Sequence, residues 1–193
     1  MGSSVHVRVA PAEASPRAAH DLLLNLASTL VDDPVLTHDD AGRPHIPGLA
    51  VSLTRTPHRI AVAATYDGPL GIDLEELEPR DFTALANRWF TPQELTWLNH
   101  QPDPLSAFLH LWTAKESTTK ALARPLHQAA LTRPVPLPQP PTPTTLPATR
   151  VPNHNNLAVI HIPLTGAVLA LTARTQTTEV VFQDHHFAVH PAA

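Results

Sequence analysis

Two carboxylates at close spacing are the first side chains in this sequence whose types suggest chemistry. Asp73 and Glu75 stand two residues apart in an apolar stretch, so on a β-strand both side chains leave the same face. A hard, oxygen-seeking cation such as Mg²⁺ would relieve the repulsion between them. Alternatively, the stretch is an edge strand running into solvent, and the two carboxylates are ordinary surface charge. Both interpretations remain open at this point.

A third carboxylate lies in the stretch Trp112–Lys120, which also holds the only two lysines of the chain, Lys115 and Lys120, against eleven arginines. A lysine head is a compact point charge suited to a phosphate oxygen, whereas arginine is a broad planar fork. On a helix, Trp112, Glu116 and Lys120 share one stripe. A Glu–Lys pair at this spacing is usually solvated. Flanking apolar stripes instead predict a buried helix, whose carboxylate needs a partner such as a shared cation.

The elements that would position these side chains follow from hydrophobic periodicity. Leucines at helical spacing predict a helix over residues 16–31, and short apolar, partly β-branched stretches predict strands over 49–53, 59–65 and 70–75. Thr91-Pro92-Gln93-Glu94 is a capping box that begins a further helix. The longest helix is expected to begin at Asp103-Pro104 and to end near Ala123.

Proline dominates the segment that follows. Its density over residues 124–152 predicts a long, locally extended loop with neither a regular helix nor an interior strand. Strands are expected after it at 157–162 and 167–173, with a weaker one at 180–182. The predicted class is α+β. A loose similarity between Ile60–Ala64 and Val168–Ala173 suggests two related halves.

Composition limits the possible functions and partners. The chain has 193 residues, a formal net charge of −4 and no cysteine, so we expect no general nucleic-acid or membrane-binding surface, no disulfide and no cysteine-ligated metal. The start of the chain shows no signal peptide, no stretch is long enough to span a bilayer, and a cytoplasmic location is expected. Thirteen histidines lack metal-ligand spacing, so we interpret them as dispersed rather than as one site.

Four segments in order resemble the signature of the 4′-phosphopantetheinyl transferases. They are Gly42-Arg43-Pro44, Gly71-Ile72-Asp73-Leu74-Glu75, the Phe-x-x-x-Glu element Phe90–Glu94, and Trp112–Lys120. The similarity extends over roughly residues 40–125. Chain length favours the type that activates surfactin synthetase, a pseudo-dimer of two similar α+β halves. This resemblance implies halves at residues 1–67 and 68–193, the first contributing to coenzyme A binding and the second carrying the metal-binding motifs.

The activity implied by the resemblance is transfer of the 4′-phosphopantetheine arm of coenzyme A to a serine of an apo carrier protein, acyl or peptidyl, releasing adenosine 3′,5′-bisphosphate. The implied cofactor is Mg²⁺, held by Asp73, Glu75 and Glu116. Glu116 would also accept the serine proton, directly or through a water. Lys120 would neutralise the departing phosphate with support from Lys115. A monomer is expected, and either Mg²⁺ or Mn²⁺ suits such oxygen ligands.

The coenzyme A contacts implied by the resemblance include one departure from the family pattern. Arg43 matches the Lys/Arg position of the Gly-Lys/Arg-Pro element and is expected to face a phosphate. The family's Ser-His pair, whose histidine meets the 3′-phosphate, is replaced by Thr54-Arg55, and arginine can bind a phosphate through two hydrogen bonds. A non-catalytic relative that binds coenzyme A or a carrier protein is therefore an alternative. An unrelated Mg²⁺ phosphohydrolase would explain the carboxylates alone.

The proline-rich loop 124–152 has two possible roles. It could contribute to carrier-protein docking, or it could be a tolerated surface insertion, which is the interpretation we prefer from the sequence. The sequence leaves open whether the carrier belongs to a fatty-acid, polyketide or peptide synthase.

Overall fold

A nine-stranded sheet forms the centre of the protein in the computed structural model, which describes residues 3–12, 15, 17–123 and 131–191. The sheet contains β1 Ser3–Pro11, β4 Ala50–Arg55, β5 Arg59–Thr65, β6 Gly71–Glu76, β7 Thr145–Val151, β8 His154–Leu164, β9 Ala167–Arg174, β10 Thr177–Phe182 and β11 His185–Pro191. A small separate hairpin is made by β2 Thr37–His38 and β3 Pro44–His45. The described helices are α1 Ala18–Ala27, α2 Thr83–Trp89, α3 Pro92–Asn99 and α4 Pro104–Ala121.

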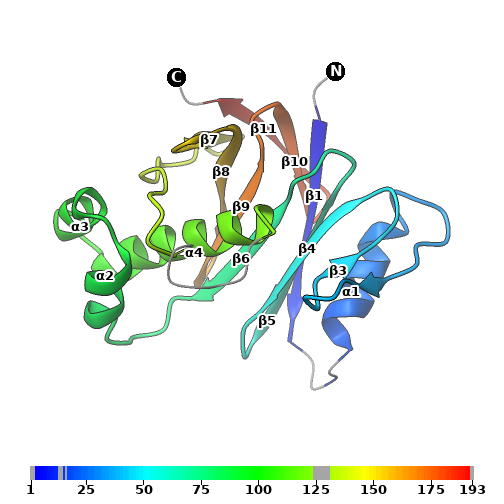
Figure 1. The fold of residues 1–193 in the computed structure, drawn as a ribbon, viewed down its shortest axis with the longest axis horizontal. Helices are drawn as coiled ribbons and strands as arrows, with labels where there is room; N and C mark the ends of the chain where they lie inside the picture. Colours follow the sequence, from blue (N-terminus) through cyan, green and yellow to red (C-terminus); the bar gives the residue numbers. More distant parts are fainter. Residues whose placement is uncertain (1–2, 13–14, 16, 124–130, 192–193) are drawn as a thin grey trace.

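The two edge strands of the large sheet lie beside each other. The strand order is β4-β5-β1-β10-β11-β7-β8-β9-β6, so β4 and β6 are its edges, yet these two strands are in contact (Figure 1). No backbone ladder joins them among the described pairings, and side chains bridge the seam instead. Ser52 Oγ on β4, for example, accepts a 3.1 Å hydrogen bond from the backbone N–H of Ile72 on β6. The seam between β4 and β6 therefore brings both halves of the sequence together.

The helices cover the sheet where the sequence predicts apolar faces. Helix α1 packs on β5, and α4 packs on β6 and β9 (Figure 1). Helices α2 and α3 lie beyond the N-terminal part of α4, where an apolar cluster includes the buried Phe90 and Phe108. The capping box at Thr91 is confirmed: its hydroxyl accepts from Glu94 N–H, and Glu94 accepts from Thr91 N–H. Helix α4 begins at Pro104 as predicted and is largely buried.

Two segments of the chain share one connectivity. In the first, β1 leads through α1 to the hairpin β4–β5, and β5 pairs antiparallel with β1. In the second, β6 leads through the helices up to α4 and then through β7 to the hairpin β8–β9, and β9 pairs antiparallel with β6. Both contain a strand, a helix and a hairpin that returns to the strand, and the second adds β7. The described residues have the α+β character predicted, although strands dominate.

The prediction for residues 124–152 is wrong in part. Residues 124–130 lie outside the described part of the chain, but Thr145–Val151 form β7, an interior strand between β11 and β8. The strand tolerates Pro147 because its register partners at that point are on β11 only, and pairing with β8 begins at Ala148.

The described residues before β7 are packed in one part and exposed in another. Val135 and Pro136 are buried, and Val135 belongs to the apolar cluster around α4. Residues 133–138 therefore pack against the molecule as an extended strap, whereas residues 139–144 are exposed. The role of the loop stays a prediction. Among the described residues, no helix combines the length and apolar character needed to cross a bilayer.

Candidate functional site

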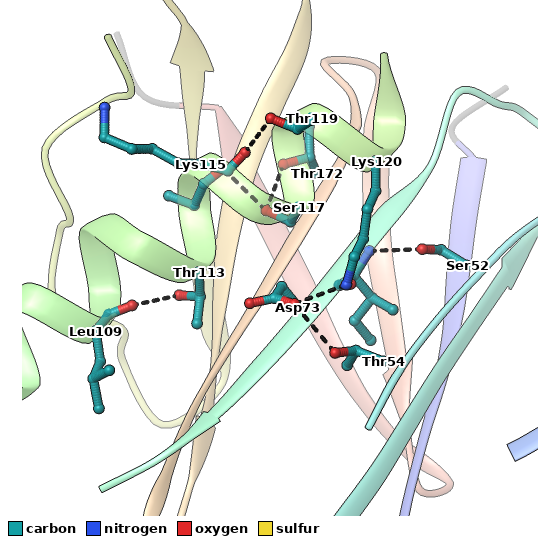
Figure 2. Close-up of polar contacts among 12 residues, drawn as sticks. Ser52, Thr54, Asp73, Leu109, Thr113, Lys115, Ser117, Thr119, Lys120 and Thr172 are labelled. Atoms are coloured by element: carbon teal, nitrogen blue, oxygen red, sulfur yellow. Dashed lines mark hydrogen bonds and ion pairs between the residues drawn. The ribbon is translucent and has the colours of Figure 1, made fainter. Parts of the chain in front are cut away.

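Asp73 lies at the seam between β4 and β6 and is the most enclosed of the predicted site residues on that seam. It is 5% exposed and receives hydrogen bonds on Oδ1 from Thr54 Oγ1 (3.1 Å) and Lys120 Nζ (2.7 Å). Figure 2 shows both donors on the same side of Asp73, Lys120 reaching down from α4 and Thr54 lying below it on β4. Burial raises the pKa of Asp73 above its usual range, and the charge of Lys120 opposes that rise.

The other oxygen of Asp73 is the unusual one. Oδ2 is buried and has no hydrogen-bond partner within the described residues. A buried acceptor without a partner lowers the stability of the folded protein by roughly 1–3 kcal/mol, and such groups are rare in native structures. A ligand that brings positive charge would satisfy it.

Glu116 and Glu75 line the same cavity as Asp73. The cavity has a volume of about 580 Å³, and among the residues around it are Thr54, Arg55, Asp73, Glu75, Glu116 and Lys120. Burial, with the charge of Asp73 in second place, raises the pKa of Glu116 to about 7, although Lys120 partly offsets this. The predicted stripe of α4 thus faces the predicted face of β6, and Trp112 also lines the cavity.

The three carboxylates fit a divalent cation in chemistry, but they are not gathered into a ready-made ligand set. In the described part of the chain, no three His, Asp or Glu side chains are grouped closely enough to hold a metal ion. Cationic side chains balance two of them instead: Arg80 donates to Glu75 at 2.8 Å, and Lys120 pairs with Asp73. The orphaned Asp73 Oδ2 and the raised pKa of Glu116 are the features that a bound cation would relieve.

A second cavity shares one lining residue, Lys120, with the first. It has a volume of about 500 Å³ and is bounded mainly by apolar atoms of residues 41–44, 51–53 and Leu70. Arg43 lies on its wall, where it pairs with Asp39 at 2.7 Å and donates to the carbonyl of Ala123 just beyond α4. Cationic side chains thus line both cavities: Arg43 lines the second, Arg55 and Arg80 line the first, and Lys120 lines both.

Arg55 lies in the wall of the first cavity with its neighbour Thr54. Its guanidinium donates to the carbonyl of Ser15 at 3.3 Å. The two residues of the predicted pair Thr54-Arg55 therefore have different surroundings. Thr54 is buried and donates a hydrogen bond to Asp73, whereas Arg55 is exposed at the rim of the cavity.

Lys115 lies apart from the rest of the predicted site. Its side chain is fully buried and points away from Asp73 (Figure 2), and Nζ lies 3.0 and 2.9 Å from the two carboxylate oxygens of Glu94. It also donates to the carbonyl of Arg133 at 2.6 Å and lies over the Phe90 ring. Glu94 accepts a further hydrogen bond from Val135 N–H. This buried cluster of hydrogen bonds around Lys115 and Glu94 connects α3, α4 and the extended strap. Neither Lys115 nor Glu94 lines either cavity.

Sequence reasoning missed two features of the site. Arg80 follows β6 closely and lines the first cavity, and its spacing after Glu75 was a local signal. Glu94, as the partner of Lys115, belonged to a recognised segment but was not paired with it, because that contact joins residues 21 positions apart.

Comparisons with known proteins identify a family. The profile described as the 4′-phosphopantetheinyl transferase superfamily matches residues 69–165, half of the chain. The matched region begins just before β6 and contains α4, and so carries Asp73, Glu75, Glu116 and Lys120.

Individual curated relatives carry the same name. The chain is 35% identical over 89 residues to a 4′-phosphopantetheinyl transferase of Bacillus subtilis, which covers 44% of this chain and 39% of the relative. It is 29% identical over 115 residues to a putative 4′-phosphopantetheinyl transferase of Haemophilus influenzae, 54% and 49% of the two chains. A third, from Bacillus pumilus, is 43% identical over 61 residues, 31% and 26%. The aligned regions thus span less than half the length of each of these relatives.

Proposed function

The chain belongs to the 4′-phosphopantetheinyl transferase superfamily, and on that premise we propose that it transfers the 4′-phosphopantetheine arm of coenzyme A to a serine of an apo carrier protein. One observation carries the proposal. Asp73, Glu116 and Lys120 line a single cavity, and Lys120 also lines a second, mainly apolar one. Coenzyme A suits these two cavities, because its anionic pyrophosphate would lie in the cavity with Lys120 and its base in the mainly apolar one.

The proposed reaction needs little covalent help from the protein. A bond forms between the serine Oγ and the phosphorus that carries the pantetheine arm, and the bond from that phosphorus to the bridging oxygen breaks. The electron pair leaves with adenosine 3′,5′-bisphosphate. Catalysis of this kind rests on positioning and on neutralising charge as it develops. Lys120, whose Nζ donates to Asp73 Oδ1 and to the Ile72 carbonyl, would neutralise the charge on the leaving oxygen.

Glu116 is the proposed acceptor of the serine proton, directly or through a water. Its raised pKa of about 7 keeps it close to the range in which a carboxylate takes up and releases a proton near neutral pH. It shares the cavity with Lys120, one helical turn away on α4, so the proton and the developing charge would be handled from one helix.

Mg²⁺ is the proposed cofactor, and Asp73, Glu75 and Glu116 are the residues that would hold it. Asp73 Oδ2 supports this assignment, because it is a buried acceptor without a hydrogen-bond partner among the described residues, and a cation would interact favourably with it. When bound, the ion would supply positive charge to the pyrophosphate. Glu75 would have to exchange its contact with Arg80 for the ion.

The remaining contacts to coenzyme A are proposed from charge and location. Arg43 would meet a phosphate from the wall of the second cavity, and Arg55 would meet the 3′-phosphate from the rim of the first. We no longer propose Lys115 as a contact to coenzyme A, because its ammonium group is buried in an ion pair with Glu94.

We also propose that the chain is a monomeric pseudo-dimer of the type that activates surfactin synthetase. The shared connectivity of the two strand–helix–hairpin segments supports two equivalent halves, with the seam between β4 and β6 near their junction. The site residues come from both sides of this seam, Thr54 from β4 and Asp73 from β6.

A mass measurement tests the proposed function. Purified protein is incubated with coenzyme A, Mg²⁺ and several apo carrier proteins of acyl and peptidyl type, with a parallel reaction in which the metal is chelated. The proposal expects at least one carrier to gain the mass of the arm only when the metal is present. No gain on any carrier, with coenzyme A binding retained, would favour the alternative of a non-catalytic relative.

A further inference from the structure

One close contact between α4 and the sheet lies at a pair of facing residues, Gly71 on β6 and Thr172 on β9. They are direct cross-strand partners in the antiparallel ladder. Gly71 lies on the same face of β6 as Asp73 and Glu75, because side chains on a strand alternate. That face is the one on which α4 packs.

Gly71 lets the helix backbone approach closely. A Cβ at this position would lie 2.0 Å from the carbonyl oxygen of Ser117 and 2.6 Å from the backbone nitrogen of Ala121, far inside any normal contact. Ser117 and Ala121 are one helical turn apart, so a full turn of α4 rests on the bare backbone of β6.

Thr172 contacts that turn of the helix through its hydroxyl. The hydroxyl oxygen is 2.9 Å from Ser117 Oγ (Figure 2) and 3.2 Å from Thr118 Oγ1. All three side chains are buried. These are the hydrogen bonds between side chains of α4 and β9 in the described part of the chain. Other hydroxyls of the helix bond within it: Thr113 donates to the Leu109 carbonyl and Thr119 to the Lys115 carbonyl.

Two residues of the candidate site are sequence neighbours of the residues of α4 that rest on Gly71. Glu116 directly precedes Ser117, and Lys120 directly precedes Ala121. Successive residues of an α-helix are about 100° apart around its axis, so the stripe of Glu116 and Lys120 adjoins the stripe that rests on Gly71. A rotation or a slide of α4 would therefore move both side chains relative to Asp73.

We infer that Thr172, acting through Ser117 and Thr118 over Gly71, is a positioning residue that fixes the rotation and height of α4 and thereby holds Glu116 in place to share a divalent cation with Asp73. Thr172 lines neither of the two cavities that Lys120 shares, so its effect is indirect. The inference rests on the proposed metal site and concerns how that site is kept in register.

The test is Mn²⁺ binding to the whole protein without coenzyme A or carrier, measured by electron paramagnetic resonance. Thr172→Val removes the hydroxyl and keeps the shape, and Ser117 Oγ keeps a second partner in the Ala114 carbonyl at 3.2 Å. Removing a group that orients a metal ligand typically weakens metal binding about 10-fold or more. We expect that loss for Thr172→Val and recovery in Thr172→Ser, which restores the hydroxyl.

Thr113→Val is the matched control, because it removes a buried hydroxyl from the same helix whose hydrogen bonds both go to carbonyls of that helix and none to the sheet. It should bind Mn²⁺ as the wild type does, and its unfolding midpoint shows how much of any change is general destabilisation. If Thr172→Val folds poorly, Ser117→Ala removes the shorter of the two contacts and should shift affinity in the same direction.

The outcomes separate this inference from the proposed function. Equal Mn²⁺ affinity in the wild type, Thr172→Val and Thr113→Val would overturn the role of Thr172 and leave the metal site intact. Failure of the wild type itself to bind Mn²⁺ would contradict the metal site and this inference with it. A second readout is kinetic: with coenzyme A varied at a fixed, saturating concentration of the carrier, Thr172→Val should lower kcat and leave the KM for coenzyme A close to that of the wild type.

Discussion

At the scale of single residues, the two lysines of the chain have different roles although they are five positions apart. Lys120 lines both cavities, and its compact head reaches both Asp73 and the Ile72 carbonyl. Lys115 is enclosed against Glu94 and contacts the strap. One lysine thus contributes charge to the site, and the other holds together the elements around it.

Replacing each lysine by methionine should separate these roles. Lys115→Met leaves the carboxylate of Glu94 buried without its cation, and breaking a buried pair in this way costs about 3–5 kcal/mol. Lys120→Met should cost less stability, because its side chain is 25% exposed, but should abolish most of the transfer activity. Urea unfolding and carrier modification measure the two effects. Unchanged stability in Lys115→Met would contradict the structural role.

The site residues could be predicted only where local spacing decides their direction. A strand with two carboxylates at i and i+2, and a helix with Glu116 and Lys120 at i and i+4, each present one face, so their convergence follows once the two elements pack. The destination of Lys115 could not be predicted in this way. Its partner Glu94 comes from another helix, and only the packing of α3 on α4 brings them together.

At the scale of elements, the approach of α4 to β6 decides whether the site exists. Gly71→Ala should push the helix away from the strand, because the added Cβ would meet the backbone of Ser117 and Ala121 rather than a side chain that can move. We expect lower stability and weaker Mn²⁺ binding than in Thr172→Val, measured by urea unfolding and paramagnetic resonance. Wild-type values for Gly71→Ala would show that the helix has more room than described.

A histidine pair joins α4 to β8 and predicts a pH dependence of stability. His161 donates through Nε2 to the His110 carbonyl at 3.0 Å, and burial, followed by the charge of His110, lowers the pKa of His161 to about 3. Below about pH 6.5, His161 binds a proton in the unfolded chain, whereas in the folded chain it stays neutral until the pH approaches 3. The free energy of unfolding should therefore fall as the pH drops from about 6.5 toward 3, by up to about 1.4 kcal/mol per pH unit.

His161→Gln keeps a donor for the carbonyl but does not titrate, so it should flatten this dependence. Urea unfolding at several pH values between 4 and 7.5 measures the slopes, and the value at pH 7.5 gives the cost of the substitution itself. Parallel slopes for the wild type and the variant would contradict the assignment of His161.

The sequence predicted the helices and strands nearest the site and missed others for identifiable reasons. Helix α4, the capping box of α3, and strands β4, β5 and β6 carry periodicity or caps that act locally. Strand β7 was missed because proline argues against an interior strand, and the staggered partners at Pro147 remove that objection only in the folded sheet. Strand β1 shows alternating Val5, Val7 and Val9, a signal that was present but short.

At the scale of the whole molecule, the last two strands hold the sheet together. Strand β10 pairs parallel with β1, and β11 pairs parallel with β7, so the end of the described chain lies between the two segments that share one connectivity. The division at residue 67 stays a prediction, but a sheet that runs through both parts predicts that they unfold as one unit.

Removing β10 and β11 tests this unity. A chain that ends at Thr175 leaves β1 without its parallel partner and exposes the edge of β7. It should lose cooperative thermal unfolding as a whole, although Asp73, Glu116 and Lys120 are all retained. Circular dichroism during heating measures this against the full chain. A sharp transition near that of the full chain would show that the two strands are dispensable.

The account depends most on Glu116 acting together with the carboxylates of β6 in one cavity. The most direct measurement is the rate of carrier modification by mass spectrometry against Mg²⁺ concentration, for the wild type and for Glu116→Gln, which keeps the size of the side chain. We expect a metal-dependent rate in the wild type and a fall of about 100-fold or more in the variant, because loss of a proton acceptor alone has that effect. A variant that modifies the carrier at the wild-type rate, with the same metal dependence, would contradict the account.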